Sequence, residues 1–409
     1  MTKENLSNTK NVWLLVIVAA LGYFVDIYDL VIFSIVRVQS FHDIGIPEAE
    51  MRVDGEYVLN MQMGGLLLGG LLWGILADKV GRIKVLFGSI LMYSLANIAN
   101  GLVNDIHSYA IIRFIAGIGL AGELGAGITL VSESMSKNKR GYGTMVVAAV
   151  GVLGAIVAYY VSEFFDWRSA YFVGGAMGLL LLILRVGTFE SGMFKDVVGK
   201  SIERGKFSML FTNKTRFKRY IYCLLIGLPI WFVVGILVTQ APEFGNALNA
   251  PVTLSAGKGI LFTYLGLSLG DVLAGLFAQI TKSRRLAVFI FQALIIVSSI
   301  WYLSSDGLTE QRFHWIAFFM GIAIGYWATF VTIASEQFGT NLRATVTTTA
   351  PNFVRGALIP STLLFEFFVR RTDIITAAYI MVFLLTGIAV FALSQLKESF
   401  NRDLDFVED

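Results

Sequence analysis

Long apolar stretches, each of about twenty residues or more, occupy almost the whole of this 409-residue chain. A helix needs roughly 20 apolar residues to cross about 30 Å of hydrocarbon, so each stretch predicts a membrane-spanning helix. Only 15% of the residues are charged, against about 25% in a soluble domain. The sequence therefore predicts an all-α integral membrane protein, not a water-soluble enzyme. The twelve stretches cover approximately residues 12–36, 54–77, 84–103, 108–131, 143–161, 168–186, 220–240, 257–280, 286–304, 313–335, 344–369 and 374–395.

The connections between the stretches are short except for one basic connection, residues 187–219. It separates six predicted spans from six, which predicts an N-terminal six-helix bundle over residues 1–186 and a C-terminal one over residues 220–409. The polar N-terminal residues precede an apolar run that is too long for a signal peptide, so we expect them to be retained.

Most of the 32 Lys and Arg residues fall in alternate connections, on one side of the predicted helices. Positive residues concentrate on the cytoplasmic side of membrane proteins. We therefore expect both termini, and the connection 187–219, to be cytoplasmic, in a multi-pass protein of the plasma membrane, which in a bacterium is the inner membrane. In this assignment Arg185 belongs with the central connection.

The two halves contain a faint internal repeat. Glu133 lies seven residues before Arg140 at the end of the fourth stretch, and Glu336 lies seven residues before Arg343 at the end of the tenth. Such a repeat is expected of a transporter built from two six-helix bundles that are related by a pseudo-twofold axis along the membrane normal.

The connection between the second and third stretches has the sequence Gly74-Ile-Leu-Ala-Asp78-Lys-Val-Gly81-Arg82-Ile-Lys84. Gly74 permits close helix contact, Gly81 permits a tight turn, and Asp78 and Arg82 can pair or cap helix ends. The segment resembles the loop signature GxLaDrxGRrr of the major facilitator superfamily, where it acts as a conformational latch. The resemblance implies the major facilitator fold, in which two bundles rock about a central site to give alternating access.

The matching segment of the second half runs from Gly275 to Arg285 and departs from the signature, with Gln279 in place of the acid and Ser283 in place of the second glycine. We expect a cytoplasmic latch that consists of the signature residues and the acids and arginines of the repeat. Its members are Gly74, Asp78, Gly81, Arg82, Glu133, Arg140, Glu336 and Arg343.

The first stretch contains two acids in the sequence Gly22-Tyr-Phe-Val-Asp26-Ile-Tyr28-Asp29-Leu30. Three residues apart, Asp26 and Asp29 share one helix face. An ionised acid at the bilayer centre costs on the order of 3 kcal/mol, so such residues normally face a cavity and take part in function. The DxYDL pattern resembles the proton-coupled symporters of phosphate, aromatic acids and other metabolites, which implies protons as the coupling ion. The alternative is a structural pair of acids neutralised by arginine.

The fourth stretch has the sequence Arg113-Phe-Ile-Ala-Gly117-Ile-Gly119-Leu-Ala-Gly122-Glu123. It resembles the RFxxGxGxGG(D/E) segment of the same symporters, which implies that Glu123 faces the central cavity and takes part in proton coupling. Arg113 is either a proton-relay partner or a structural counter-ion. The glycines also match a dinucleotide-binding fingerprint, but no strand precedes them, so we expect them to serve helix packing.

Arg355 lies near the middle of the eleventh stretch, followed by Gly356. Related symporters have Lys or Arg followed closely by Gly in this region, which implies a cation that faces the cargo. A buried guanidinium needs an anion, which either the cargo or a protein carboxylate can supply. The second case is a permanent salt bridge to Asp26, Asp29 or Glu123, which would leave the charge of the cargo unconstrained.

Five further residues within the spans are candidates for the ligand site, although aromatic residues in membrane helices more often serve packing or interface anchoring. They are Tyr28, Tyr264, Asp271, Trp327 and Asn352.

Several function classes are excluded. The three histidines and the single Cys223 have no metal-site spacing, no phosphate-binding loop GxxxxGK[ST] occurs, and the net charge of +3 does not suggest a nucleic-acid partner. We therefore expect no enzymatic activity, no cofactor and no metal, and a transporter that works as a monomer in the lipid bilayer.

The hypothesis is a proton-coupled symporter of a small anionic metabolite, namely a carboxylate, an aromatic acid or phosphate. One alternative is a proton-coupled sugar or polyol importer, or a drug or metabolite exporter, of the same fold. Another is a receptor of this fold that binds cargo without transporting it.

Overall fold

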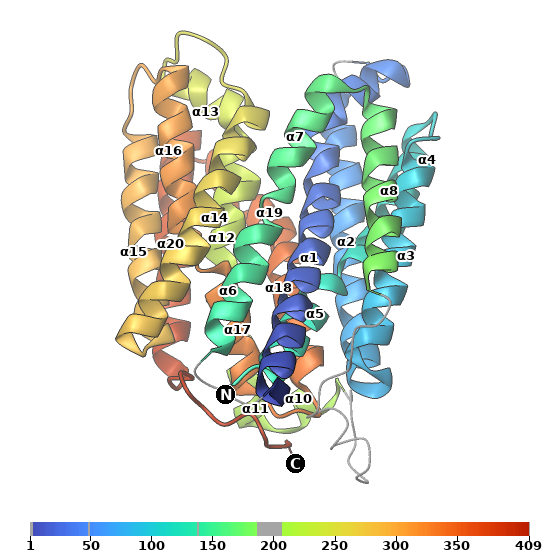
Figure 1. Ribbon diagram of the computed structural model, residues 1–409. Helices are drawn as coiled ribbons and strands as arrows, with labels where there is room; N and C mark the ends of the chain where they lie inside the picture. The colour runs from blue at the N-terminus through green and yellow to red at the C-terminus, as the bar shows by residue number, and fades with distance from the viewer. Residues whose placement is uncertain (1–2, 48–49, 137–138, 186–206, 409) are drawn as a thin grey trace.

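The computed structural model describes residues 3–47, 50–136, 139–185 and 207–408. Within these residues all regular structure is helical, and twelve helices or runs of helices are long and apolar enough to cross a membrane. They confirm the twelve predicted spans (Figure 1).

In the first half, the spans are formed by α1 (Lys3–Asp43), α2 (Met51–Val80), α3 (Arg82–Asn100), α4 (Ile106–Leu120) with α5 (Glu123–Ser134), α6 (Arg140–Gly151) with α7 (Gly154–Phe164), and α8 (Trp167–Leu184). In the second half, the short α10 (Met209–Thr212) precedes α11 (Lys214–Leu225), which continues through α12 (Leu228–Phe232) into a π-helix, η1 (Val233–Val238). The remaining helices are α13 (Ala241–Ala247), α14 (Ala256–Thr281), α15 (Arg284–Leu303), α16 (Glu310–Ala323) with α17 (Trp327–Gln337), α18 (Arg343–Gly356) with α19 (Leu358–Val369), and α20 (Ile374–Gln395).

Two spans are longer than the sequence predicts. The first ends at Asp43 instead of near residue 36. The seventh begins at Lys214 instead of near residue 220, because the Asn213 side chain accepts hydrogen bonds from the backbone N–H groups of Thr215 and Arg216 and so caps the helix. The seventh span therefore begins within the predicted connection 187–219, of which residues 187–206 lie outside the described residues.

The helix interruptions repeat between the halves. The fourth span breaks at residues 121–122 and the tenth at residues 324–326. The breaks begin 203 residues apart, which equals the offset between Glu133 and Glu336. A break frees backbone groups near mid-membrane, where interrupted helices of transporters form binding sites.

The helices form two groups that follow the two halves of the sequence, with the helices from α11 to α20 beside those from α1 to α8 (Figure 1). The groups meet through related contacts, since α2 packs against α18 and α14 packs against α6. These are the second span with the eleventh and the eighth with the fifth. The marks for both chain ends lie at one end of the molecule (Figure 1), which we call the terminal end.

Glycines allow the closest helix contacts. A Cβ at Gly117 of α4 would collide with the backbone of Gln62 in α2, and a Cβ at Gly65 of α2 would collide with the backbone of Phe114 in α4. The glycines of the fourth span thus serve helix packing. Within the second half, α14 and α16 approach each other in the same way at Gly266 and Gly321.

Aspartates start three of the spans. Asp105, Asp166 and Asp373 cap α4, α8 and α20 by accepting hydrogen bonds from backbone N–H groups of the first turn. The hydrogen bonds from the Ser108 and Ser169 N–H groups hold the pKa of Asp105 and of Asp166 below the usual range of aspartate.

Two adjacent glycines of α2 provide a test of this packing. Gly65→Ala should lower the free energy of unfolding by about 1–3 kcal/mol, because the added methyl group overpacks the contact with α4. Gly64→Ala should change it by less than about 0.5 kcal/mol, since the nearest neighbour of its Cβ is the Phe114 ring at 3.8 Å. The measurement is thermal unfolding in detergent, followed with a thiol-reactive dye at the buried Cys223. Equal destabilisation by both variants would contradict this packing.

Candidate functional site

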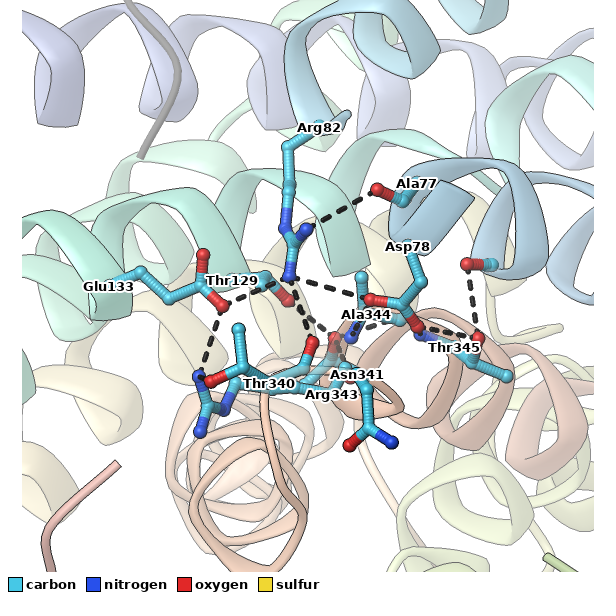
Figure 2. Close-up of polar contacts among 12 residues, drawn as sticks. Ala77, Asp78, Arg82, Thr129, Glu133, Thr340, Asn341, Arg343, Ala344 and Thr345 are labelled. Carbon is cyan, nitrogen blue, oxygen red and sulfur yellow. Dashed lines mark hydrogen bonds and ion pairs between the residues drawn. The ribbon is translucent and has the colours of Figure 1, made fainter. Parts of the chain in front are cut away.

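At the terminal end, Asp78 caps a helix of the other half. Its carboxylate accepts hydrogen bonds from the backbone N–H groups of Ala344 at 3.2 Å and Thr345 at 2.7 Å, and from the Thr345 hydroxyl at 2.6 Å (Figure 2). These donors form the first turn of α18. A negative charge is favourable at a helix N-terminus, so this contact stabilises the approach of α2 to α18.

Arg82 extends this contact into a buried charge cluster (Figure 2). Its guanidinium lies 3.4 Å from Asp78 and 3.0 Å from Glu133, and donates to the Thr340 carbonyl at 3.3 Å. Glu133 also accepts from Arg343 at 3.0 Å. One carboxylate of the first half therefore binds an arginine from each half.

The second half forms the equivalent cluster. Glu336 pairs with Arg284 of its own half at 2.6 Å and with Arg140 of the first half at 2.8 Å. The acid of each repeat thus pairs with the arginine of the other repeat, Glu133 with Arg343 and Glu336 with Arg140. The second copy of the signature keeps its arginine contact, and Gln279 lies against Gly141 in the first turn of α6, as Asp78 lies against α18.

The segment after α20, residues 397–408, crosses the terminal end of the molecule (Figure 1). It contacts Arg140 and Arg343, the two arginines that pair with an acid of the other half. Arg140 donates to the Arg402 carbonyl at 2.7 Å, and Arg343 donates to the Leu404 carbonyl at 2.6 Å. These contacts were not predicted from the sequence. An apolar residue within the polar segment, Leu404, indicates that it packs against the protein, and Leu404 is 1% exposed.

Near mid-membrane, Arg355 lines a cavity of about 20 Å³ together with Tyr23, Trp231, Tyr264 and Trp327. A cavity of this size holds about one water molecule. The guanidinium carbon lies 5.8 Å from the ring centre of Trp231 and 5.5 Å from that of Trp327. Arg355 is 1% exposed, so its charge is removed from solvent.

Arg355 makes one hydrogen bond, from Nη1 to the Asn352 Oδ1 at 3.3 Å. Its Nε and Nη2 have no partner among the described residues, and the ion pairs within the same part of the chain include none of Arg355 with a carboxylate. The structure thus does not show the permanent salt bridge that the sequence left open.

Two other intramembrane acids are paired with arginines. Asp29 accepts from Arg113 at 2.7 Å, and Glu123 pairs with Arg185. The sequence analysis placed Arg185 in the central connection, whereas the structure buries it at the C-terminus of α8. The carboxylate of Asp26 is fully buried, and neither of its oxygens has a hydrogen-bond partner in the described ranges.

The remaining candidates occupy different positions. Tyr264 and Trp327 line the cavity. Tyr28 donates to the Ala170 carbonyl at 2.7 Å within the first half, and Asp271 accepts from the backbone N–H of Ala328 at 2.9 Å, at the start of α17. Asn352 donates to the Ala121 carbonyl at 2.9 Å and so joins the halves beside Arg355. Tyr23 and Trp231 are two cavity residues that the sequence analysis missed, because periodicity does not distinguish a cavity aromatic from a packing aromatic.

A larger cavity of about 400 Å³ opens away from the latch, with Arg37, Glu243 and Glu366 among its lining residues. A smaller cavity of about 30 Å³ lies between the two, because it shares Ser34 with the large cavity and Trp231 with the central one. The molecule is therefore closed at the terminal end and hollow on the opposite side.

Removal of one charge from the closed end should open it. In Glu336→Gln, Arg140 and Arg284 lose their carboxylate partner, and breaking a buried ion pair costs about 3–5 kcal/mol. A cysteine introduced at Thr347, whose hydroxyl lies 2.6 Å from that of Thr129 in the other half, should react with an impermeant maleimide at least about tenfold faster, since about 1.4 kcal/mol gives that factor.

The matched control for this charge removal is Glu310→Gln. It removes the exposed ion pair of Glu310 with Lys258 at the opposite end and should leave the labelling rate unchanged. An unchanged rate in Glu336→Gln would show that this ion pair does not hold the end closed.

Comparison with known proteins agrees with this architecture. The sequence profile of the Major Facilitator Superfamily matches residues 12–360. A putative niacin/nicotinamide transporter of Bacillus subtilis strain 168 is 26% identical, over 85% of this chain and 87% of the relative. A cis,cis-muconate transport protein of Acinetobacter baylyi is 25% identical, over 84% and 85%.

Among solved structures, a proton:xylose symporter bound to 6-bromo-6-deoxy-D-glucose superposes with a TM-score of 0.75 at 16% identity, over 97% of this chain and 98% of that chain. This similarity shows a shared fold. Since the family profile also covers most of the residues, the chain belongs to the Major Facilitator Superfamily and is a multi-pass membrane transporter.

Proposed function

We propose that the protein is a proton-coupled symporter of a small anionic metabolite, for which an aromatic or unsaturated carboxylate is the best fit. The observation that carries this proposal is Arg355, a buried guanidinium that lines the central cavity without a carboxylate partner in the described residues. Buried guanidinium N–H groups without acceptors are strongly unfavourable, and a bound anion would supply the acceptors.

The pairing of the other intramembrane charges supports this assignment. Arg113 neutralises Asp29, and Arg185 neutralises Glu123. Asp26 is the acid whose carboxylate has no hydrogen-bond donor in the described ranges.

Charge balance links Asp26 to the cargo. With an ionised Asp26 and a charged Arg355, the empty site is neutral, and a monovalent anion would bring its net charge to −1. Protonation of Asp26 restores neutrality, which in a low-dielectric site is the favourable state. Anion and proton therefore bind together more favourably than either alone, which is the coupling that symport requires.

The cavity walls favour a flat cargo. Trp231 and Trp327 form an edge-to-face pair, with 6.4 Å between their ring centres and 69° between their planes, and the guanidinium of Arg355 lies over both rings. Aromatic faces bind planar unsaturated groups by dispersion and quadrupole contacts. The relatives named for niacin/nicotinamide and for cis,cis-muconate support a cargo of this chemical class.

During the transport cycle, the terminal end and the opposite end of the molecule would be closed in turn. The described form is closed by the ion pairs at the terminal end and reaches the central cavity from the opposite side. With the termini in the cytoplasm, as the positive-inside rule favours, this is the outward-facing form in the bacterial inner membrane. Cargo and proton would then favour the opposite form.

Replacement of Asp26 tests the coupling. Asp26→Asn keeps the volume but removes the proton site, so the variant should exchange labelled cargo between equal pools and fail to accumulate it from a pH gradient. Liposomes that contain a pH-sensitive dye, challenged in turn with pooled phosphate, carboxylates, aromatic acids, amino acids and polyols, measure the proton flux.

Asp29→Asn is a contrasting variant, because it leaves Arg113 buried without its carboxylate and should lower the yield of folded protein. Full accumulation by Asp26→Asn would disprove the assignment of Asp26. Ligand-induced thermal stabilisation of the unaltered protein without any flux would instead indicate a receptor.

Replacement of Arg355 tests the charge of the cargo. Arg355→Ala should raise the KM for the anionic pool about 30-fold or more, since loss of one partner of a buried charge pair costs about 2–5 kcal/mol. Arg355→Lys should recover little of this loss, because an ammonium group lacks the planar two-donor edge. Uptake of a sugar or polyol that is unaffected by Arg355→Ala would show that the cargo is neutral.

A further inference from the structure

The two tryptophans beside Arg355 differ in the use of their indole N–H groups. Trp327 donates to the hydroxyl of Tyr23 at 2.9 Å, across the two halves. Trp231 lines the same cavity and is 9% exposed, yet its Nε1 has no acceptor among the residues that the structure describes. Buried indole N–H groups usually find a partner, so this donor is available to a ligand.

The free donors of Arg355 are arranged for an anion. Asn352 occupies Nη1, which leaves Nε and Nη2 unpartnered. These two nitrogens form one edge of the guanidinium, whose two parallel N–H groups match the two oxygens of a carboxylate. Each carboxylate oxygen has a second lone pair, and the Trp231 N–H is the additional donor on the cavity wall.

We propose that Trp231 is a specificity-determining residue, whose indole N–H donates a hydrogen bond to the carboxylate of a cargo that Arg355 holds. This inference rests on the proposed function. The three free donors of the site prefer a group that only accepts hydrogen bonds. A carboxamide directs an N–H group at one of these donors and leaves it unpaired, so the site selects a carboxylate over the corresponding amide.

The position of Trp231 on the path to the site supports this role. Trp231 borders both the central cavity and the small cavity that leads to the outer one. Its helix, α12, continues directly into the π-helix η1, and such local irregularities are frequent at functional sites. A carboxylate that enters from the outer cavity would therefore meet Trp231 before or together with Arg355.

The test compares an acid with its amide. Binding of benzoate and of benzamide is measured by titration calorimetry on the purified full-length protein in detergent, for the unaltered chain and for Trp231→Phe. Loss of one hydrogen bond to a charged group should weaken benzoate binding about tenfold more than it weakens benzamide binding. The ratio of the two affinities should fall accordingly.

Trp327→Phe is the matched control, because it removes an indole N–H that is already used within the protein. It should leave the benzoate to benzamide ratio unchanged. Should Trp231→Phe fail to fold, β-(3-benzothienyl)alanine at this position keeps the ring size and replaces the N–H by sulfur.

The outcomes separate the two hypotheses. If the unaltered protein binds benzoate and the benzothienyl or phenylalanine variant keeps the same ratio, the role of Trp231 is disproved and the proposed function stands. If neither benzoate nor any other carboxylate binds to the unaltered protein, the proposed function is disproved, and the role of Trp231 with it.

Discussion

A charge within a membrane must be neutralised, and this constraint organises the whole interior of the protein. Two arginine–carboxylate pairs lie inside the first half, Arg113 with Asp29 and Arg185 with Glu123. Each of these pairs connects helices of one bundle, so neither has to break when the bundles move. Asp26 and Arg355 come from different halves, and neither has an ion-pair partner among the described residues; Arg355 lines the central cavity.

The same constraint shapes the terminal end, where buried charges join the halves. Glu133 and Glu336 each bind an arginine of their own half and one of the other half. In the proposed transport cycle, each acid would keep its own arginine and exchange the second one for water when the halves separate. Single hydrogen bonds therefore change the free energy of closing this end. The packed helix contacts at the glycines, by contrast, do not exchange partners.

The sequence predicts the spans well because hydrophobic length is a local property. It also identifies Asp78, Glu133 and Glu336 as members of one region, because they lie at equivalent helix ends. The partners of these acids depend on how the two bundles face each other, which no local pattern records. Arg185 illustrates the difficulty. A basic residue at the end of an apolar run usually lies in a loop, but here an ion pair with the buried Glu123 keeps Arg185 inside the bundle.

The site roles stay predictions for the same reason. Among the candidates, Tyr28 and Trp327 are both aromatic residues of apolar helices, and the sequence treats them alike. In the structure one donates within its own bundle and the other lines the cavity. Trp231 was not distinguishable from a packing residue until its neighbours were known, because an unused donor is a property of the surroundings.

The exchange of partners between Glu133, Arg140, Glu336 and Arg343 has a consequence for the origin of the fold. Each half presents one acid and one arginine, and each pair joins the acid of one half to the arginine of the other. This is the pattern of an isologous twofold interface, in which a surface patch is complementary to a second copy of itself. A chain of six spans with one such acid and one such arginine would form both ion pairs with a second copy of itself. The contact that closes this transporter is therefore one that a homodimer of six-span chains could also make.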